Sequence, residues 1–276
     1  MLFLFIYAND VKYNIISIIK LFADDIVLIK EIDNPVNDFR ELNNDIEALN
    51  SWSKKWLITF NAEKTKYLIS SRKPKKCTHS SLIPDSVSIK QVLRYKHLGL
   101  IFSDKMTWSD HIDDSCKRSN KHLDVIAKMR YILPRLCIEK LHNSFVCSML
   151  DYSDVIYYNC SNIDSTKIEN IQRWACIILM GVVRETRYKT PLKEAGVEPL
   201  KTRRKLHRLT YLFKIKKKKL TPDYLVNIHV QNYDLRRPSQ LIPIRDRTAI
   251  YYNSSFAATI RDWNSLPKDV LSARSV

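Results

Sequence analysis

Glycine is scarce in this chain: only three of its 276 residues are glycine, roughly 1% against an ordinary level near 7%. The sequence therefore offers little material for tight β-turns. It also contains neither a GxGxxG nor a GxxxxGK[ST] string, the glycine-rich loops that cradle phosphates. Nucleotide binding through a P-loop or a Rossmann crevice is excluded.

Paired cysteines are lacking as well. Six cysteines are scattered along the chain without a CxxC pair, and the one close Cys/His pair, Cys77 and His79, has no matching second half. A structural zinc site is therefore not predicted. Buried free thiols are typical of a reducing compartment. We expect an intracellular protein, without distinguishing nucleus from cytoplasm.

Long hydrophobic runs are lacking too. The N-terminal apolar run covers only residues 1–8, has no basic region before it, and ends at Asn9 and Asp10. It is too short to span a bilayer and does not have the organisation of a signal peptide. We expect no membrane partner, and we interpret this run as the end of a core element that begins upstream.

Acidic residues are scarce in the last third of the chain. Residues 1–104 carry 15 Lys and Arg against 12 Asp and Glu, residues 105–181 carry 10 against 9, and residues 182–276 carry 21 against 8. Such a lopsided excess favours contact with a polyanion, with nucleic acid as the natural partner. A solvated, solubilising surface is the alternative.

The most informative local pattern lies in residues 15–30, where two β-branched apolar runs are joined by Ala23, Asp24 and Asp25. Such runs are typical of strands buried on both faces. Two carboxylates in apolar surroundings are either exposed at a turn or neutralised by a cation. The alternatives are thus an ordinary hairpin closed by preferred turn residues and a hairpin that holds metal.

Apolar periodicity predicts that helices dominate the rest of the chain. Asn34 and Pro35 form a capping residue and a first-turn proline, so we expect an amphipathic helix over 35–56. The polar, proline-bearing segment 71–86 is predicted to be an exposed loop. Helical spacing predicts further helices at 109–131, 137–150, 166–181 and 199–216.

Two segments between these helices have distinctive sequences. Residues 60–66 read Phe-Asn-Ala-Glu-Lys-Thr-Lys and lead into a predicted strand at 67–69. Residues 95–102 form a strand-like run in which Gly99 permits close approach of a neighbouring backbone. We interpret His97 in this run as a partly buried strand histidine.

Taken in order, these segments resemble the reverse transcriptases of non-LTR retrotransposons of the jockey-like kind. The resemblance rests on Phe-Ala-Asp-Asp at 22–25, Phe-Asn-x-x-Lys-Thr at 60–65, Tyr-Lys-His-Leu-Gly at 95–99 and Trp-Asn-Ser-Leu-Pro at 263–267. It implies an α+β fold in three parts. Residues 1–104 would be an incomplete polymerase palm, an antiparallel sheet with packed helices. Residues 105–181 would be a helical thumb, and 182–276 a basic, mainly helical C-terminal region.

The resemblance also implies an activity, that of an RNA-directed DNA polymerase transferring nucleotides to a primer 3′ end. Its partners would be an RNA template, a DNA primer or target and deoxynucleoside triphosphates, with no small-molecule cofactor. Asp24 and Asp25 would hold Mg²⁺, or Mn²⁺, in a two-metal site, with Asp24 the primary ligand. Lys64 would lie near the leaving pyrophosphate, unless it is a surface lysine at a strand entrance. The primer grip would comprise Tyr95, Leu98 and Gly99.

The helix predicted at 199–216 is crowded with cations and is interpreted as an element that contacts phosphates. Residues 216–219 are all lysine, which fits a nuclear address and a solvated face equally well. The predicted nucleic-acid-binding residues are Lys201, Arg203, Arg204, Lys205, Arg208 and Lys214.

In the family, a further catalytic aspartate comes from an earlier strand, whereas this chain offers only Asp10 before Asp24. Two carboxylates alone hold Mg²⁺ weakly. We therefore expect that the chain on its own does not extend a primer. A non-catalytic nucleic-acid-binding protein, either a repurposed or a decaying remnant, is the alternative. A helical interaction scaffold with an incidental basic tail is a third hypothesis.

Overall fold

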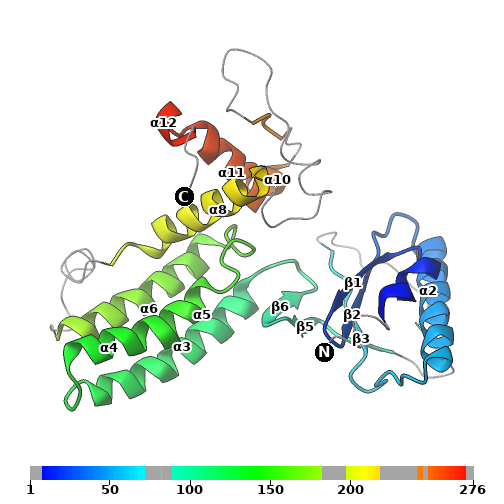
Figure 1. Cartoon of the computed structure of the whole chain (residues 1–276), viewed down its shortest axis with the longest axis horizontal. Coiled ribbons are helices and arrows are strands. Elements are labelled where there is room, and N and C mark those ends of the chain that lie inside the picture. The colour runs from blue at the N-terminus through cyan, green and yellow to red at the C-terminus, as the bar shows by residue number, and fades with distance from the viewer. Residues whose placement is uncertain are drawn as a thin grey trace. The chain divides into compact units, whose positions relative to one another are not determined.

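The computed structural model of the chain comprises two compact units, Met1–Met106 and Thr107–Val276 (Figure 1). Helices and small sheets coexist, so the predicted α+β class is confirmed at that level. The second unit, residues 107–276, covers both the predicted thumb and the predicted C-terminal region, and the division between those two regions stays a prediction. The residues that the structure describes are 8–71, 82, 89–181, 197–217, 241–244 and 248–271.

The predicted hairpin is present in the first unit. Strands β1 (Ile18–Phe22) and β2 (Asp25–Ile29) pair antiparallel, with Phe22 opposite Asp25. This register leaves Ala23 and Asp24 as a two-residue loop, and Ala23 has a positive φ of 52°. A two-residue loop with a positive φ is the tightest connection between antiparallel strands.

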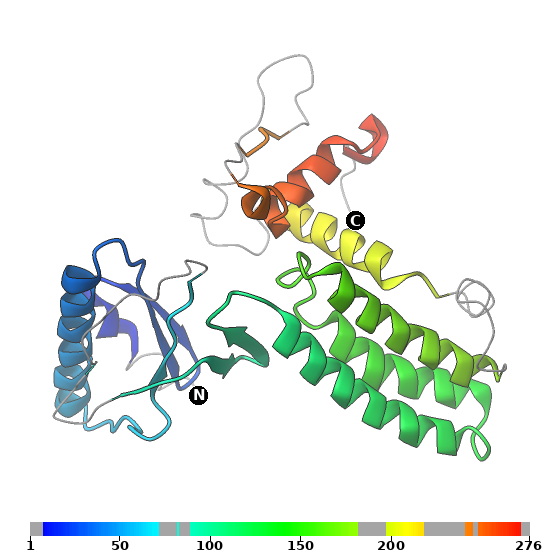
Figure 2. The ribbon, with the colours of Figure 1, turned by 180° about the vertical axis from the view of Figure 1, so that it is seen from behind.

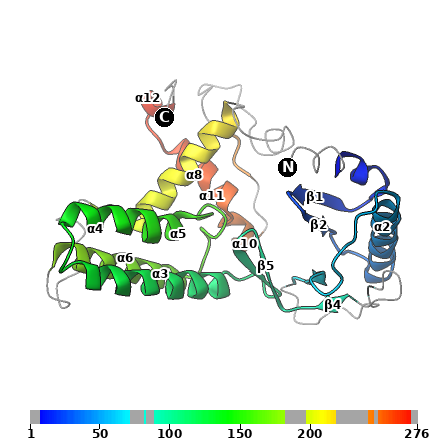
Figure 3. The same cartoon turned by 60° about the horizontal axis from the view of Figure 1, so that its bottom comes forward.

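The expectation that these strands are buried on both faces is wrong. The side chains of Ile18, Phe22 and Ile29 are 58%, 59% and 49% exposed. The reason is the small size of the sheet, because β1 and β2 have no further strand neighbour among the described residues. Helix α2 (Pro35–Lys55) runs along one side of this hairpin (Figures 1 and 3).

Helix α2 begins where the sequence predicted. The Asn34 side chain accepts a hydrogen bond from the Asn37 backbone N–H at 3.5 Å, and Pro35 occupies the first turn. Phe39 and Leu49 on this helix are buried. Capping and apolar periodicity therefore agree on where α2 begins and which of its residues are buried.

A buried aspartate ties α2 to the segment before the hairpin. The carboxylate of Asp45 is 1% exposed and accepts the backbone N–H groups of Ile16 and Ser17 at 2.8 and 2.9 Å. These two bonds satisfy a charge that would be costly to bury alone. They also fix where β1 starts relative to α2.

The strand-like run at 95–102 is a second hairpin and not a single strand. Strands β5 (Arg94–His97) and β6 (Leu100–Ser103) pair antiparallel through a turn at Leu98 and Gly99. Both turn residues have positive φ, 46° and 80°, the pattern of a type I′ turn. Gly99 therefore serves the turn rather than a close backbone approach. His97 is half-buried, as predicted.

The remaining strands of this unit are short. Strand β3 (Lys66–Tyr67) pairs parallel with β4 (Lys90–Gln91). Most of the predicted loop at 71–86 lies outside the described residues. Within it, Leu82 is only 2% exposed, so the loop is not exposed along its whole length.

The second unit is a helical bundle, as its apolar periodicity predicted. Helices α3, α4, α5 and α6 lie side by side (Figures 1 and 2). A π-helical segment, η3, is inserted between α4 and α5 and contains the fully buried Val146. The bounds are α3 Ser109–Met129, α4 Arg135–His142, η3 Asn143–Cys147, α5 Ser148–Asp151 and α6 Asn162–Met180.

Helix α6 starts four residues earlier than predicted. Ser161 caps it, because its hydroxyl accepts the backbone N–H of Asp164 at 3.1 Å. The Asp164 carboxylate in turn accepts the hydroxyl of Ser109 at 2.7 Å, so the starts of α6 and α3 are joined. Polar capping, which apolar spacing does not register, sets this boundary.

Helix α8 (Leu200–Lys216) contacts α6 and α11 (Ser255–Asn264). Short helices α10 (Ala249–Tyr252) and α12 (Lys268–Leu271) flank α11. Trp263, from the motif at 263–267, is 3% exposed in a core shared by these elements. That core comprises Leu212, Phe213, Leu241, Ile260, Trp263 and Leu271. None of the described helices has the length and apolar character that crossing a bilayer requires.

Candidate functional site

The two adjacent carboxylates lie at the tip of the β1–β2 hairpin. Asp24 belongs to the two-residue loop and Asp25 is the first residue of β2. Both side chains are exposed. The short loop and the paired strands fix the backbone positions of the two residues.

Asp10, the aspartate that precedes this pair in the sequence, already accepts hydrogen bonds within the chain. The Asp10 carboxylate accepts the indole N–H of Trp52 at 2.7 Å and that of Trp56 at 3.2 Å. Trp52 lies in the last turn of α2, and Trp56 is the C-cap residue of that helix. Among the described residues, no third carboxylate or histidine groups with Asp24 and Asp25 at metal-sharing distance.

Lys64, the residue predicted near the leaving pyrophosphate, lies in a turn before β3. Its side chain is exposed, and its backbone N–H donates to the Asn61 side chain at 3.0 Å. Within the described part of the chain, no ion pair or hydrogen bond joins it to Asp24 or Asp25. Its predicted role stays a prediction.

The residues predicted to form a primer grip lie together on the β5–β6 hairpin. Tyr95 is half-buried and pairs opposite Phe102, while Leu98 and Gly99 form the turn. Leu98 is 38% exposed in the left-handed region. That conformation costs a residue with a β-carbon about 1–2 kcal/mol, so this turn holds local strain.

Two of the cations assigned to nucleic-acid binding are buried, which corrects the prediction for them. Arg208 is 1% exposed and donates to Thr259 at 3.0 Å and to Asp262 at 2.8 Å. Arg204 is 2% exposed, with its guanidinium over the ring of Tyr157. Both arginines pack the bundle instead of facing a phosphate.

The other predicted cations of α8 differ in how far they are engaged. Arg203 pairs with Asp151 at 2.8 Å, and Lys205 pairs with Asp262 at 2.9 Å. Lys201 is exposed and Lys214 is half-buried. Lys218 and Lys219 of the lysine run lie outside the described residues. The basic helix is therefore in large part an internal packing element.

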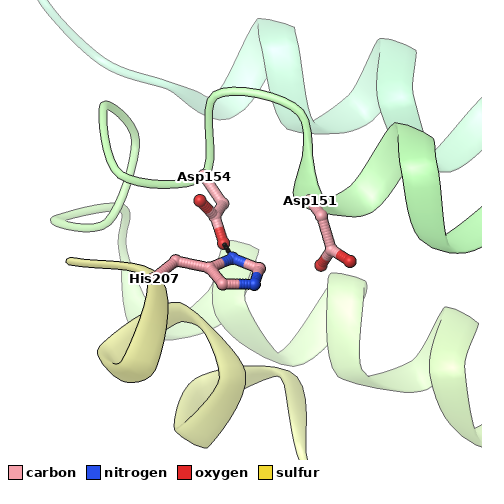
Figure 4. A group of neighbouring side chains, drawn as sticks. All are labelled: Asp151, Asp154 and His207. Carbon is pink, nitrogen blue, oxygen red and sulfur yellow. Dashed lines mark hydrogen bonds and ion pairs between the residues drawn. The ribbon is translucent and has the colours of Figure 1, made fainter. Parts of the chain in front are cut away.

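The structure also brings together a polar group that sequence reasoning missed, Asp151, Asp154 and His207 (Figure 4). One ligand atom of each lies within 4.8 Å of the others. His207 Nδ1 is 2.6 Å from an Asp154 carboxylate oxygen, and Asp151 faces Arg203. His207 is on α8, 53 residues from Asp154, so no sequence spacing could have revealed the group.

The electrostatics of this group favour a structural role. Asp154 is 2% exposed, and burial raises the pKa of its carboxyl although the neighbouring His207 opposes that change. Asp151 is engaged by Arg203, a cation that disfavours a second cation beside it. The group links α8 to the loop that follows α5, and its charges are satisfied within the chain.

The described cysteines are free thiols. Burial raises the pKa of Cys116 and of Cys176 to about 11 each, which keeps both protonated and unreactive at neutral pH. Cys137 is exposed, so the expectation of buried thiols does not hold for every cysteine. Cys77 lies outside the described residues.

Comparison with protein-family models, with curated proteins and with solved structures found no match to this chain.

Proposed function

We propose that this chain is a reverse-transcriptase segment of the non-LTR retrotransposon kind, in which the β1–β2 hairpin is the metal-holding turn of the polymerase palm. The observation that carries the proposal is the two-residue loop that places Asp24 and Asp25 together, exposed, at the end of two apolar strands. Divalent ions held there stabilise the attacking and leaving oxygens of nucleotidyl transfer.

A strained turn in the predicted primer grip supports the same proposal. Leucine is an unfavourable residue at the first position of a type I′ turn, where asparagine or glycine is preferred. Leu98 nevertheless occupies that position, with part of its side chain exposed. Strained residues concentrate where a side chain contacts a ligand, and a primer end is the ligand that the resemblance implies.

One observation favours the second candidate, a non-catalytic nucleic-acid-binding protein. The described residues supply only two carboxylates at the hairpin, and Asp10 is held by two indoles. Mg²⁺ retains its waters and binds weakly unless further ligands converge. In this alternative the basic excess of the chain still recruits nucleic acid, but the hairpin has no role in it.

The test uses NMR to detect Mn²⁺ binding to the full chain. Selective ¹⁵N-alanine labelling provides a reporter amide at Ala23, next to both carboxylates. Substoichiometric Mn²⁺ is expected to broaden the Ala23 signal first. Adding an RNA–DNA primer–template and a deoxynucleoside triphosphate is expected to tighten Mn²⁺ binding, because phosphate oxygens complete the coordination.

The Asp24→Asn, Asp25→Asn double variant is expected to abolish the broadening, whereas Asp33→Asn, at an exposed aspartate of the same unit, is expected to preserve it. Nucleic-acid binding without any effect of Mn²⁺ on Ala23 would favour the non-catalytic candidate and reject the metal hairpin.

A further inference from the structure

The helical hairpin formed by α3 and α4 exposes several large apolar side chains. Tyr131 and Ile132, in the connection between the helices, are 86% and 82% exposed. The side chains of the other four residues in the set named below are roughly two fifths to three fifths exposed. We name this set the α3–α4 apolar surface: Val125, Met129, Tyr131, Ile132, Leu136 and Phe145.

Val125, Met129 and Phe145 are placed together by helix geometry and ring stacking. Tyr131, Ile132 and Leu136 follow within seven residues of Met129, and the Ile132 N–H donates to the Met129 carbonyl at 2.9 Å, which keeps the connection beside the end of α3. His122, Val125 and Met129 are spaced by three and four residues, so they share one face of α3. The ring of His122 stacks on that of Phe145, with 5.5 Å between centroids, which brings Phe145 from η3 to the same face. Large apolar side chains gathered in this way on an exposed face mark an interaction site.

The charges around this surface have one dominant sign. Residues 117–145 carry seven Lys and Arg and only two Asp and Glu. Lys121, Lys128 and Lys140 are exposed, and one of the two acidic residues, Glu139, is paired with Arg135 at 2.7 Å. Lys121 and Lys128 lie four residues before and three residues after Val125, and Lys140 lies four residues after Leu136, so these cations border the apolar surface as a positive rim.

We propose that the α3–α4 apolar surface binds an acidic amphipathic helix of a partner protein. A two-helix apolar face accepts the apolar side of a third helix, anchored at spacings of three and four residues. Glutamates and aspartates beside those anchors would meet the exposed lysines of the rim, which favours this partner over a neutral one.

Charge also decides against the other occupants. A second copy of this chain would bring one positive rim against another, and like charges in an interface are costly. Nucleic acid would be attracted by the lysines and would stack bases on Tyr131 or Phe145, but it would leave the aliphatic Val125, Ile132 and Leu136 without an apolar partner. The inference does not depend on the hairpin of the first unit, so it stands apart from the proposed polymerase function.

The test uses the full chain and a fluorescent model helix of about 18 residues, five turns. The helix carries leucines on one face and glutamates on the other. Two matched peptides serve as controls, one with the leucines dispersed around the helix and one with lysine in place of glutamate. Fluorescence anisotropy is expected to show saturable binding of the first peptide and at least about tenfold weaker binding of both controls.

Variants of the chain locate the site. Ile132→Glu and Leu136→Glu are expected to weaken binding about tenfold or more each. Val36→Glu, at an apolar position of α2 that is 80% exposed, is expected to leave it unchanged. Circular dichroism checks that each variant keeps its helices.

Three results would overturn the proposal. Equal binding of the peptide with dispersed leucines would show that charge alone attracts the peptide. If sedimentation shows that the chain self-associates and Ile132→Glu abolishes this association, the surface binds a second copy of the chain. Binding to phosphatidylserine vesicles that needs Ile132, without binding of the glutamate peptide, would make the surface a membrane contact.

Discussion

Arg208 shows how a single buried side chain can hold several elements together. Its guanidinium lies 3.4 Å from the ring centroid of Tyr158 while it donates to Thr259 and Asp262 on α11. Aromatic stacking and two hydrogen bonds compensate a charge that is almost fully removed from water. One residue of α8 thereby joins α11 to the loop before α6.

Arg208→Ala is expected to destabilise the chain by about 2–4 kcal/mol, because it removes the hydrogen bonds to Thr259 and Asp262 and opens a void beside Tyr158, although Lys205 still pairs with Asp262. Urea unfolding followed by circular dichroism measures this loss. Arg135→Ala, which removes an exposed ion pair with Glu139, is the matched control and is expected to cost under about 0.5 kcal/mol. Equal effects of the two variants would contradict the role assigned to Arg208.

Asp164 provides a prediction on pH. Burial raises the pKa of this carboxyl, but hydrogen bonds from Ser109, Ser161 and Lys167 outweigh burial and leave the pKa below its ordinary value. A carboxyl whose pKa is lower in the folded state stabilises the fold above its unfolded pKa. That contribution disappears as the pH falls through the folded pKa.

Stability to urea is therefore expected to fall on acidification below about pH 4. Asp164→Asn is expected to be less stable at neutral pH and to lose less on acidification, since its contribution is already absent. Unfolding curves at neutral and acidic pH for both proteins test this. Parallel pH profiles would show that Asp164 does not contribute.

At the scale of elements, the β5–β6 hairpin retains strain at its turn. Leu98→Asn is expected to stabilise the first unit by about 1 kcal/mol, because asparagine tolerates the left-handed conformation that leucine resists. Thermal unfolding measures the gain. Gly99→Ala, at a φ of 80°, is expected to destabilise the same turn. A stability loss in Leu98→Asn would show that leucine makes contacts worth more than the strain.

Elements specified by neighbouring residues were predictable from the sequence. Helix α2 was expected over 35–56 and spans Pro35–Lys55, because its cap and its apolar face are both local signals. The turn at Leu98 was missed because its positive φ depends on the pairing of β5 with β6. The burial of Arg208 was missed because α11, some fifty residues further along the chain, supplies its partners.

The same distinction applies to the candidate sites. The tip of the first hairpin was predictable because Asp24 and Asp25 lie between two apolar runs. The group of Asp151, Asp154 and His207 forms only when α8 packs against the bundle, so no local pattern encodes it.

At the scale of the whole molecule, the net charge of +17 is the dominant property. The full chain is expected to bind an RNA–DNA duplex with an affinity that falls steeply with salt, since each neutralised phosphate contributes a slope of about −0.9 in log K against log salt. Fluorescence anisotropy from low to physiological salt measures this slope. Salt-independent binding, or no binding, would favour the helical scaffold.

Substitution of Lys201, which is exposed, tests whether the basic C-terminal region makes the phosphate contacts. Lys201→Ala is expected to reduce the magnitude of the salt slope by about one. Lys105→Ala, at an exposed lysine outside the basic region, is expected to leave it unchanged. An identical slope in both variants would place the phosphate contacts elsewhere.

The π-helical segment at Asn143–Cys147 has a consequence for which changes in length the gene can accept. A π-turn holds one more residue than the α-turn it replaces, so residues before and after it are out of phase with an uninterrupted helix. Deleting one residue within it would restore a regular α-helix and keep the residues beyond it in register, because the wider π-turn is what accommodates the extra residue. Deleting one residue from the α-helical turns of α4 would instead rotate everything beyond by about 100°. Leu150 would then leave the core and Asp151 would turn away from Arg203. We therefore expect the chain to accept a single-residue deletion in the π-helical segment but not in α4.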